Sequence, residues 1–100
     1  GDKKRAIADY ERAIELDPKY TIAYYTRRRA YSDLGDKKRA IADYDRVIEL
    51  DPKYTAAYIS RGKVYNELGD NKRGIADLKT AARLGGKGAQ DLLRSQGIEW

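Results

Sequence analysis

The stretch GDKKRAIADYERAIELDPKYT at residues 1–21 returns as GDKKRAIADYDRVIELDPKYT at residues 35–55. A third, weaker copy, GDNKRGIADLKTAARLGG, begins at Gly69, so the period is 34 residues. A period of this length predicts stacked supersecondary units, each of which buries its apolar face against the next unit.

Two helical patterns alternate along the chain. In the first pattern an aspartate (Asp2, Asp36 or Asp70) follows a glycine and is placed to cap the helix. Apolar residues then recur at helical spacing, and in the first two copies Leu-Asp-Pro ends the pattern. The second pattern repeats alanine and tyrosine at helical spacing and stops at a glycine. We therefore expect helices at about residues 3–17, 20–33, 37–50, 54–67, 71–84 and 87–96.

The composition limits both the core and the chemistry. Apolar residues make up 41% of the 100-residue chain and charged residues 37%, so we expect one domain with a thin core. Cysteine and histidine are absent, which removes disulfides, thiolate nucleophiles, imidazole bases and the usual zinc ligands. No cofactor and no metal are expected. No apolar run is long enough for a signal peptide or a membrane span, which favours a cytoplasmic location without a membrane partner.

The sequence resembles the tetratricopeptide repeat family, whose pattern is W-x2-L-G-x2-Y, then A-x3-F, a small residue and P. In that register residues 21–54 supply Tyr24, Arg27, Arg28, Tyr31, Gly35, Ala40, Tyr44, Val47 and Pro52. Residues 55–88 supply Tyr58, Arg61, Gly62, Tyr65, Gly69, Gly74, Leu78 and Ala81. Residues 1–20 supply only the second half of a repeat, with Ala6, Tyr10, Ala13 and Pro18.

The resemblance implies an all-α fold of helical hairpins, stacked as a right-handed superhelical solenoid with a C-terminal capping helix. The expected single domain comprises half a repeat (1–20), two full repeats (21–54 and 55–86) and a capping helix with its tail (87–100). The chain opens in mid-repeat and two copies are almost identical, which favours an engineered or truncated fragment.

Members of this family are non-catalytic scaffolds for protein–protein contact, in which the first helix of each hairpin lines a peptide-binding groove. By register, that groove would consist of Ile22, Tyr25, Thr26, Arg29, Ser32 and Asp33, followed by Ala56, Ile59, Ser60, Lys63, Asn66 and Glu67. Arg29 and Lys63 offer positive charge to a carboxylate, and the net charge of +5 favours an acidic partner. Each cation also stands four residues before an acidic side chain, so pairing within the helix is an equal alternative.

Some family members hold the terminal carboxylate of a chaperone peptide with lysine and asparagine at set registers. Those registers contain Tyr25, Ile59, Thr26, Ser60, Arg29 and Lys63 here. The motif is not reproduced, so that ligand is not predicted.

Arg28 departs from the repeat, because the next copy has Gly62 at its position. In the family this site takes a small residue, since the two helices of a hairpin approach closely there. Overpacking such a contact costs about 1–3 kcal/mol. One outcome is that the side chain reaches solvent past Tyr24 with a cation–π contact. The others are that the hairpin of helices 20–33 and 37–50 opens, or that the arginine binds a ligand.

We favour hairpin opening over ligand binding. An open hairpin would add a second uncovered apolar face to that of the first helix, and the chain would form a swapped or intertwined homo-oligomer. The residues predicted for self-association are Arg28, Ile7, Tyr10 and Ile14.

Two alternative functions remain open. The 21 basic residues and nine tyrosines suit a basic nucleic-acid-binding repeat, although 16 acidic residues interleave with them and most tyrosines fall at core registers. The chain also fits a designed model of folding or assembly that has no ligand. Catalysis is not expected, because each carboxylate is explained by a cap, a loop or a pair on a helix surface.

Overall fold

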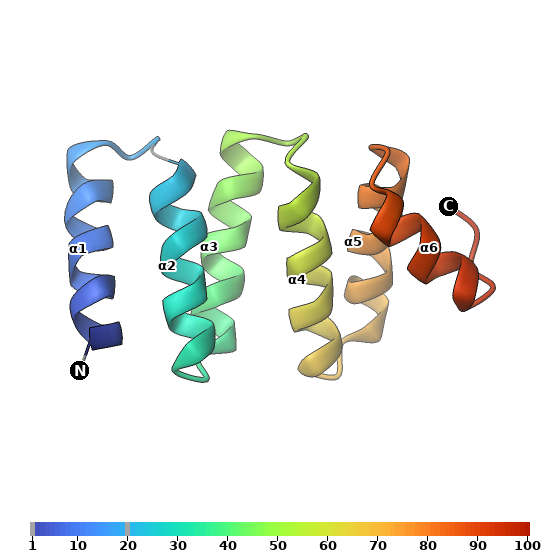
Figure 1. Ribbon diagram of the computed structural model, residues 1–100, viewed down its shortest axis with the longest axis horizontal. Helices are drawn as coiled ribbons and strands as arrows, with labels where there is room; N and C mark the ends of the chain where they lie inside the picture. The colour runs from blue at the N-terminus through green and yellow to red at the C-terminus, as the bar shows by residue number, and fades with distance from the viewer. Residues whose placement is uncertain (1, 20) are drawn as a thin grey trace. The chain divides into compact units, whose positions relative to one another are not determined.

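The computed structural model describes residues 2–19 and 21–100, and all regular structure in that part of the chain is α-helical (Figure 1). The helices are α1 (Asp2–Leu16), α2 (Thr21–Asp33), α3 (Lys37–Leu50), α4 (Thr55–Glu67), α5 (Asn71–Arg83) and α6 (Lys87–Ser95). All the expected helices are present, and their ends agree with the prediction within one residue. Gly1 and Tyr20, the latter the expected start of the second helix, lie outside the described residues.

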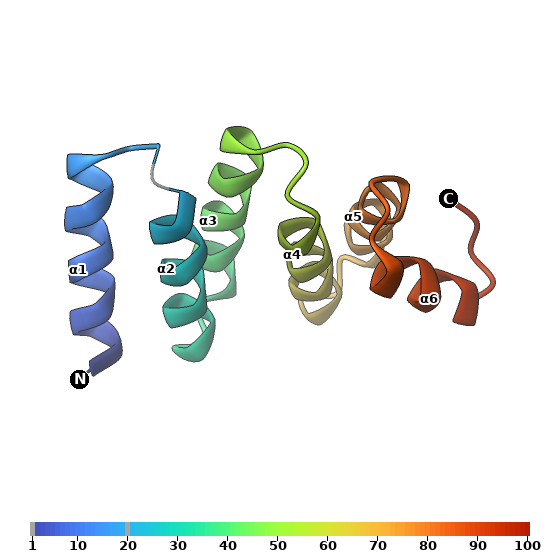
Figure 2. The same ribbon diagram turned by 45° about the horizontal axis from the view of Figure 1, so that its top comes forward.

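The chain divides into two compact units, Gly1–Pro52 with α1 to α3 and Lys53–Trp100 with α4 to α6. In the first unit α2 packs against both α1 and α3, and in the second α5 packs against both α4 and α6 (Figure 2). The predicted division into half a repeat, two full repeats and a capping helix stays a prediction.

Local signals in the sequence explain the helix ends. The predicted caps at Asp36 and Asp70 are confirmed, since each carboxylate accepts a hydrogen bond of 3.2 Å from the backbone N–H three residues later. Asp2 was also predicted as a cap, but it is the first residue of α1, a difference within the usual variation of helix ends. Gly35 and Gly69 follow α2 and α4 with φ of 79° and 85°, a conformation that favours glycine.

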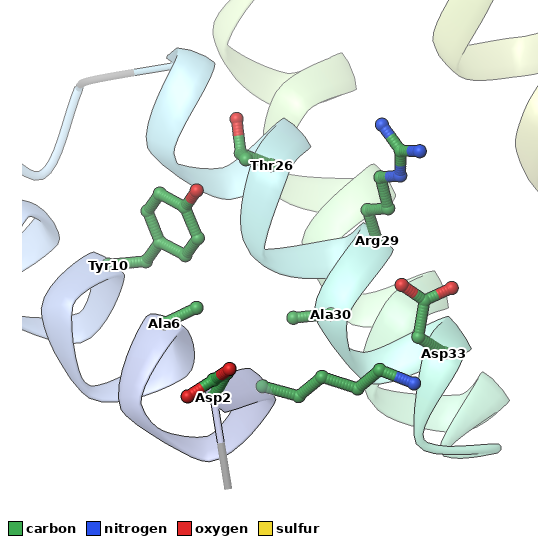
Figure 3. Close-up of a pocket in the computed structure, with 8 residues that line it drawn as sticks. Asp2, Ala6, Tyr10, Thr26, Arg29, Ala30 and Asp33 are labelled. Carbon is green, nitrogen blue, oxygen red and sulfur yellow. The ribbon is translucent and has the colours of Figure 1, made fainter.

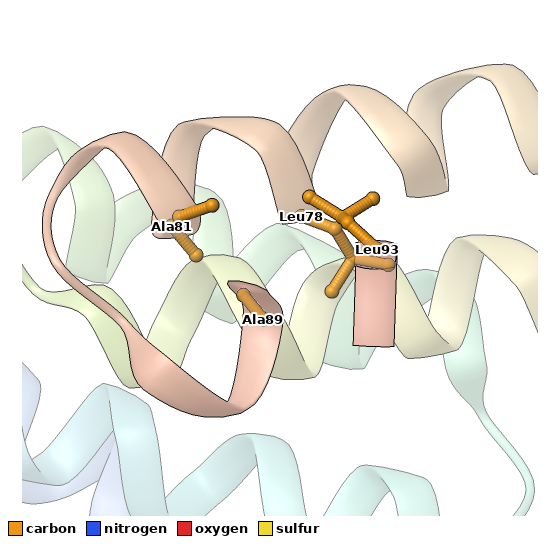
Figure 4. Packing of buried hydrophobic residues seen from close by; sticks show 5 residues of the cluster. Leu78, Ala81, Ala89 and Leu93 are labelled. Carbon is orange, nitrogen blue, oxygen red and sulfur yellow. The ribbon is translucent and has the colours of Figure 1, made fainter. Parts of the chain in front are cut away.

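Small residues let the helices approach one another closely. In the second unit the buried cluster is formed by Leu78, Ala81, Ala82, Ala89 and Leu93 of α5 and α6 (Figure 4). The side chains of Tyr58, Ile59, Leu92, Ile98 and Trp100 are half-buried and pack against it. Through this cluster the apolar side chains of α6 pack against α5.

A buried ion pair joins the two helices of each hairpin. Arg27 of α2 donates from Nε and Nη2 to the two carboxylate oxygens of Asp43 on α3, at 2.9 and 2.5 Å. Arg61 of α4 makes the same bidentate contact with Asp77 on α5, at 2.8 and 2.7 Å. The aspartate side chains are only 4% and 8% exposed, and both arginine side chains are 18% exposed. The pair is therefore a repeated internal contact of the hairpin.

These ion pairs correct a sequence prediction. The head group of Arg27 contacts Asp43 between the helices. Asp43 and Asp77 were expected to be caps, loop residues or surface partners, but both are buried. Sequence analysis missed these ion pairs because arginine and aspartate stand 16 residues apart in the sequence and come into contact only when the two helices of the hairpin pack together.

Burial and pairing act in opposite directions on the carboxyl of Asp43. Removal from water raises its pKa, and the hydrogen bonds and charge of Arg27 lower it by less than burial raises it. The same hydrogen bonds raise the pKa of the Arg27 guanidinium. Because both groups are desolvated, loss of one partner leaves a charge that the interior stabilises poorly.

Asp43→Asn is expected to lower the free energy of unfolding by about 3 kcal/mol, because it leaves the Arg27 guanidinium buried without its counter-charge. Denaturant unfolding followed by circular dichroism measures this loss. The matched control is Asp9→Asn, which changes the equivalent residue of α1, where the carboxylate is exposed. That change is expected to stay within about 0.5 kcal/mol. Equal effects of the two substitutions would contradict the assigned role of the ion pair.

The close approach of α4 and α5 gives a second prediction. A Cβ at Gly62 would lie 2.9 Å from the carbonyl oxygen of Gly74, so Gly62→Ala requires a backbone shift and is expected to destabilise by about 1–3 kcal/mol. Gly88 in α6 has no atom within 4 Å of such a Cβ, so Gly88→Ala is expected to stabilise by about 0.5–1 kcal/mol. Thermal unfolding of both variants provides the measurement, and a stabilising Gly62→Ala would be inconsistent with close packing.

Candidate partner-binding site

A hollow of about 320 Å³ lies between α1 and α2 (Figure 3). It is lined by Asp2, Lys3, Ala6 and Tyr10 of α1 and by Thr26, Arg29, Ala30 and Asp33 of α2. Ala6 and Tyr10 point toward α2, and Ala30 points toward α1. The floor is thus formed by small and aromatic side chains, with charged groups along its length.

The hollow unites residues from two separate sequence predictions. Thr26, Arg29 and Asp33 were predicted for the peptide groove, and Tyr10 was predicted for self-association. Asp2, Lys3, Ala6 and Ala30 were not singled out as binding residues. They line the hollow because two small side chains, Ala6 and Ala30, lie opposite each other on α1 and α2. The sequence alone does not show which helices face each other, so sequence analysis missed these residues.

The α2 part of the predicted groove is largely accessible. Ile22 is 65% exposed, Arg29 and Asp33 are exposed, and Thr26 and Ser32 are half-buried. The Thr26 hydroxyl donates to the carbonyl of Ile22 at 2.7 Å. In the described part of the chain Arg29 and Asp33 form no ion pair with each other, so the pairing within the helix that we considered is not observed.

Tyr25 is engaged in the hairpin rather than turned toward a ligand. Its ring meets that of Tyr44 edge to face at 6.3 Å, and the guanidinium of Arg28 lies 4.4 Å from its centre. The apolar contact that Tyr25 was expected to offer is therefore partly used inside the protein.

The α4 part of the predicted groove likewise contains some residues that are exposed and some that pack inside the protein. Ala56, Lys63, Asn66 and Glu67 are exposed and Ser60 is half-buried. Ile59 packs against the cluster between α5 and α6, so it too contributes to the core. Asn66 lines a separate hollow of about 280 Å³ together with Asn71, Ile75 and Gln96.

Arg28 is accommodated within a closed hairpin. Its guanidinium lies 4.4 Å from the ring centre of Tyr25 and 5.2 Å from that of Tyr44, whereas one of the three outcomes considered had placed it beside Tyr24. Its Nε is buried and has no hydrogen-bond partner among the described residues. Ala40 and Tyr44 of α3 are fully buried, so the predicted opening of the hairpin is wrong for the single chain. Two aromatic faces offset part of the cost of burying the cation.

The remaining residues predicted for self-association lie along α1. Ile7 lines a second hollow of about 460 Å³ with Lys4, Tyr31, Leu34, Asp36 and Arg39, and Ile14 is half-buried. None of the described residues of α1 is buried, and Leu16 at its end is 78% exposed. α1 therefore presents more uncovered surface than the two helices that repeat its sequence.

Two further structural findings concern other kinds of site. Across residues 2–19 and 21–100, no helix has the length and apolar character needed to cross a membrane. In the same part of the chain, no three acidic side chains gather where they could hold a metal ion.

Family models match most of the chain. A model described as tetratricopeptide repeat matches residues 1–20 and 55–84, and one described as TPR repeat matches residues 29–69. A comparison with curated proteins gave no match.

Solved structures support the same relationship. A crystal structure of MamA has 31% sequence identity and a TM-score of 0.82 over 90% of this chain, which spans 53% of the MamA chain. The second TPR of Spaghetti (RPAP3), bound to the HSP90 peptide SRMEEVD, has 30% identity and a TM-score of 0.76, covering 84% of this chain and 78% of that one. The first TPR of the same protein has 26% identity and a TM-score of 0.82, covering 95% and 77%.

Proposed function

Since the chain belongs to the tetratricopeptide repeat family, we propose that it is a non-catalytic scaffold for protein–protein contact. The all-α repeat fold predicted from the sequence is confirmed. The proposed ligand is an acidic peptide, to which the first unit offers the exposed residues of α2 and the second unit those of α4.

Two exposed cations carry this proposal. Arg29 and Lys63 occupy equivalent positions in the two repeats, and neither forms an ion pair with another described residue. A cation that is already paired gains little from a ligand carboxylate, whereas an unpaired one gains a charge-assisted hydrogen bond. Each unit therefore offers one unpaired cation to an acidic residue of a peptide.

The non-catalytic part of the proposal rests on the placement of the titratable groups. The two buried carboxylates, Asp43 and Asp77, are committed to Arg27 and Arg61. The chain has no histidine and no cysteine, so no imidazole or thiolate stands beside them. A nucleic-acid-binding repeat remains the alternative, and its test is a salt-dependent gel shift with random oligonucleotides.

Arg29→Glu and Lys63→Glu are each expected to weaken binding of acidic peptides by about 3- to 10-fold, since each replaces an attractive charge with a repulsive one. The measurement is fluorescence anisotropy with a library of labelled peptides rich in aspartate and glutamate, at low and high salt. SRMEEVD, which the related TPRs bind, is a comparison peptide for which no tight binding is expected, because the registers of a carboxylate clamp are occupied by other residues.

The matched control is Lys38→Glu, which makes the same change of charge at an exposed position of α3. It is expected to leave affinity unchanged beyond a small long-range effect. Equal weakening by all three variants would show that the affinity for acidic peptides depends only on the net charge of the chain. That result would argue against specific binding by the exposed residues of α2 and α4.

Self-association is a second candidate function, with Ile7, Tyr10 and Ile14 of α1 at the contact. The observation that favours it is the uncovered surface of α1, in which no described residue is buried. If it occurs, sedimentation velocity will show a mass that rises with concentration, and Ile14→Glu will return the chain to a monomer. A constant monomer mass would remove this candidate.

A further inference from the structure

A small polar hollow in the second unit is lined by three side-chain amides. Asn66 near the end of α4, Asn71 at the start of α5 and Gln96 directly after α6 line a volume of about 280 Å³, together with Ile75 of α5. The three amide side chains are exposed, and Ile75 is half-buried. Three separate helices thus bring the same functional group to one place.

The protein itself leaves the hydrogen-bonding capacity of these amides unused. Across the residues that the structure describes, none of the three side chains takes part in a hydrogen bond. Gln90 of α6 shows the contrast, because its Nε2 donates to the carbonyl of Ala82 at 2.9 Å. Each carboxamide has two N–H donors and one carbonyl acceptor. The hollow therefore presents donors and acceptors side by side to a ligand.

Comparison with the preceding repeat shows how the sequence forms this hollow. One period earlier, Ser32 and Lys37 stand at the positions of Asn66 and Asn71. The later repeat thus replaces a hydroxyl and a cation with two amides. It also has Gly74 where the earlier repeat has an alanine, and a Cβ at this position would collide with the side-chain oxygen of Asn66. Three differences between the repeats therefore come together at one place on α4 and α5.

The lack of charge around the hollow limits what it can bind. Its described lining residues include neither a cation nor a carboxylate, although 37% of the chain is charged. An ion that left water for this hollow would lose hydration without gaining a counter-charge. An uncharged amide, by contrast, both donates to and accepts from a carboxamide. The volume lies near the lower end of the range of ligand sites, about 300–1,000 Å³, so it suits a single side chain.

We propose that this hollow recognises an uncharged side-chain amide, that of a glutamine or an asparagine in a bound peptide. The three carboxamides of the hollow exchange hydrogen bonds with that amide, and Ile75 packs against the methylene group beside it. Asn66 belongs to the predicted groove and follows Lys63 by three residues, so both lie on one face of α4. The inference therefore rests on the proposed function and adds specificity to it, since an amide next to the acidic residue of the peptide would be selected.

The test uses three capped amino acids that differ only in the side chain. They are the N-acetyl amides of glutamine, glutamate and leucine, which share the same backbone amides. Each is titrated into the full chain labelled with nitrogen-15, and the NMR signals of the side-chain NH₂ groups are followed. The glutamine probe is expected to give saturable shifts at Asn66, Asn71 and Gln96, and to bind at least about 5-fold more tightly than the other two probes. The NH₂ signal of Gln90 is expected to stay in place, because that group is already hydrogen-bonded.

Two matched variants restore residues that the same fold already holds in the preceding repeat. Asn66→Ser and Asn71→Lys are each expected to weaken binding of the glutamine probe by about 5-fold, because each removes a hydrogen-bonding amide. Lys63→Glu, which is expected to weaken binding of acidic peptides, is expected to leave binding of this uncharged probe unchanged. Failure of this proposal is therefore distinguishable from failure of the proposed function.

Three results would overturn the proposal. The first is the lack of any saturable shift with the glutamine probe. The second is a leucine or glutamate probe that binds as tightly as the glutamine probe, because the side-chain amide would then not be the group that is recognised. The third is unchanged affinity of both Asn66→Ser and Asn71→Lys for the glutamine probe, because the probe would then bind elsewhere.

Discussion

A bidentate contact between arginine and aspartate fixes how α2 pairs with α3 and how α4 pairs with α5. The two charges are buried between helices whose cores consist mainly of alanine, tyrosine and a few leucine and valine side chains. Such small side chains bury little apolar area each, so close approach and correct register matter more than bulk. A buried ion pair contributes little net stability, but it strongly penalises arrangements that separate its partners. In this chain the ion pair therefore determines which helices pack together and how they are aligned along their axes.

The same contact explains where sequence analysis succeeded and where it did not. Helix ends were predictable because glycine, aspartate and proline act locally, and their positions repeat every 34 residues. The role of Asp43 was not predictable from local spacing, because its partner lies 16 residues away on another helix. Its recurrence at positions 9, 43 and 77, together with arginine at 27 and 61, was the available signal.

Arg28 illustrates a second limit of sequence reasoning. Its size left three outcomes open, namely escape to solvent past Tyr24, an open hairpin or ligand binding. The structure instead places its guanidinium against the rings of Tyr25 and Tyr44. Two aromatic faces stabilise this cation, even though its Nε is buried and lacks a hydrogen-bond partner among the described residues. Contact with Tyr25 also removes that side chain from the predicted groove, so the groove depends more on exposed charge than on apolar contact. Only a part of the candidate site was thus visible in the sequence.

A double-mutant cycle on Arg61 and Asp77 tests the central role of the ion pair most directly. The variants are Arg61→Met, Asp77→Ala and their combination, and the measurement is the free energy of unfolding from denaturant titration. A coupled pair predicts that the double variant is more stable than the sum of the single effects implies, by about 1–3 kcal/mol. Additive effects within about 0.5 kcal/mol would contradict the account, because the two charges would then act independently.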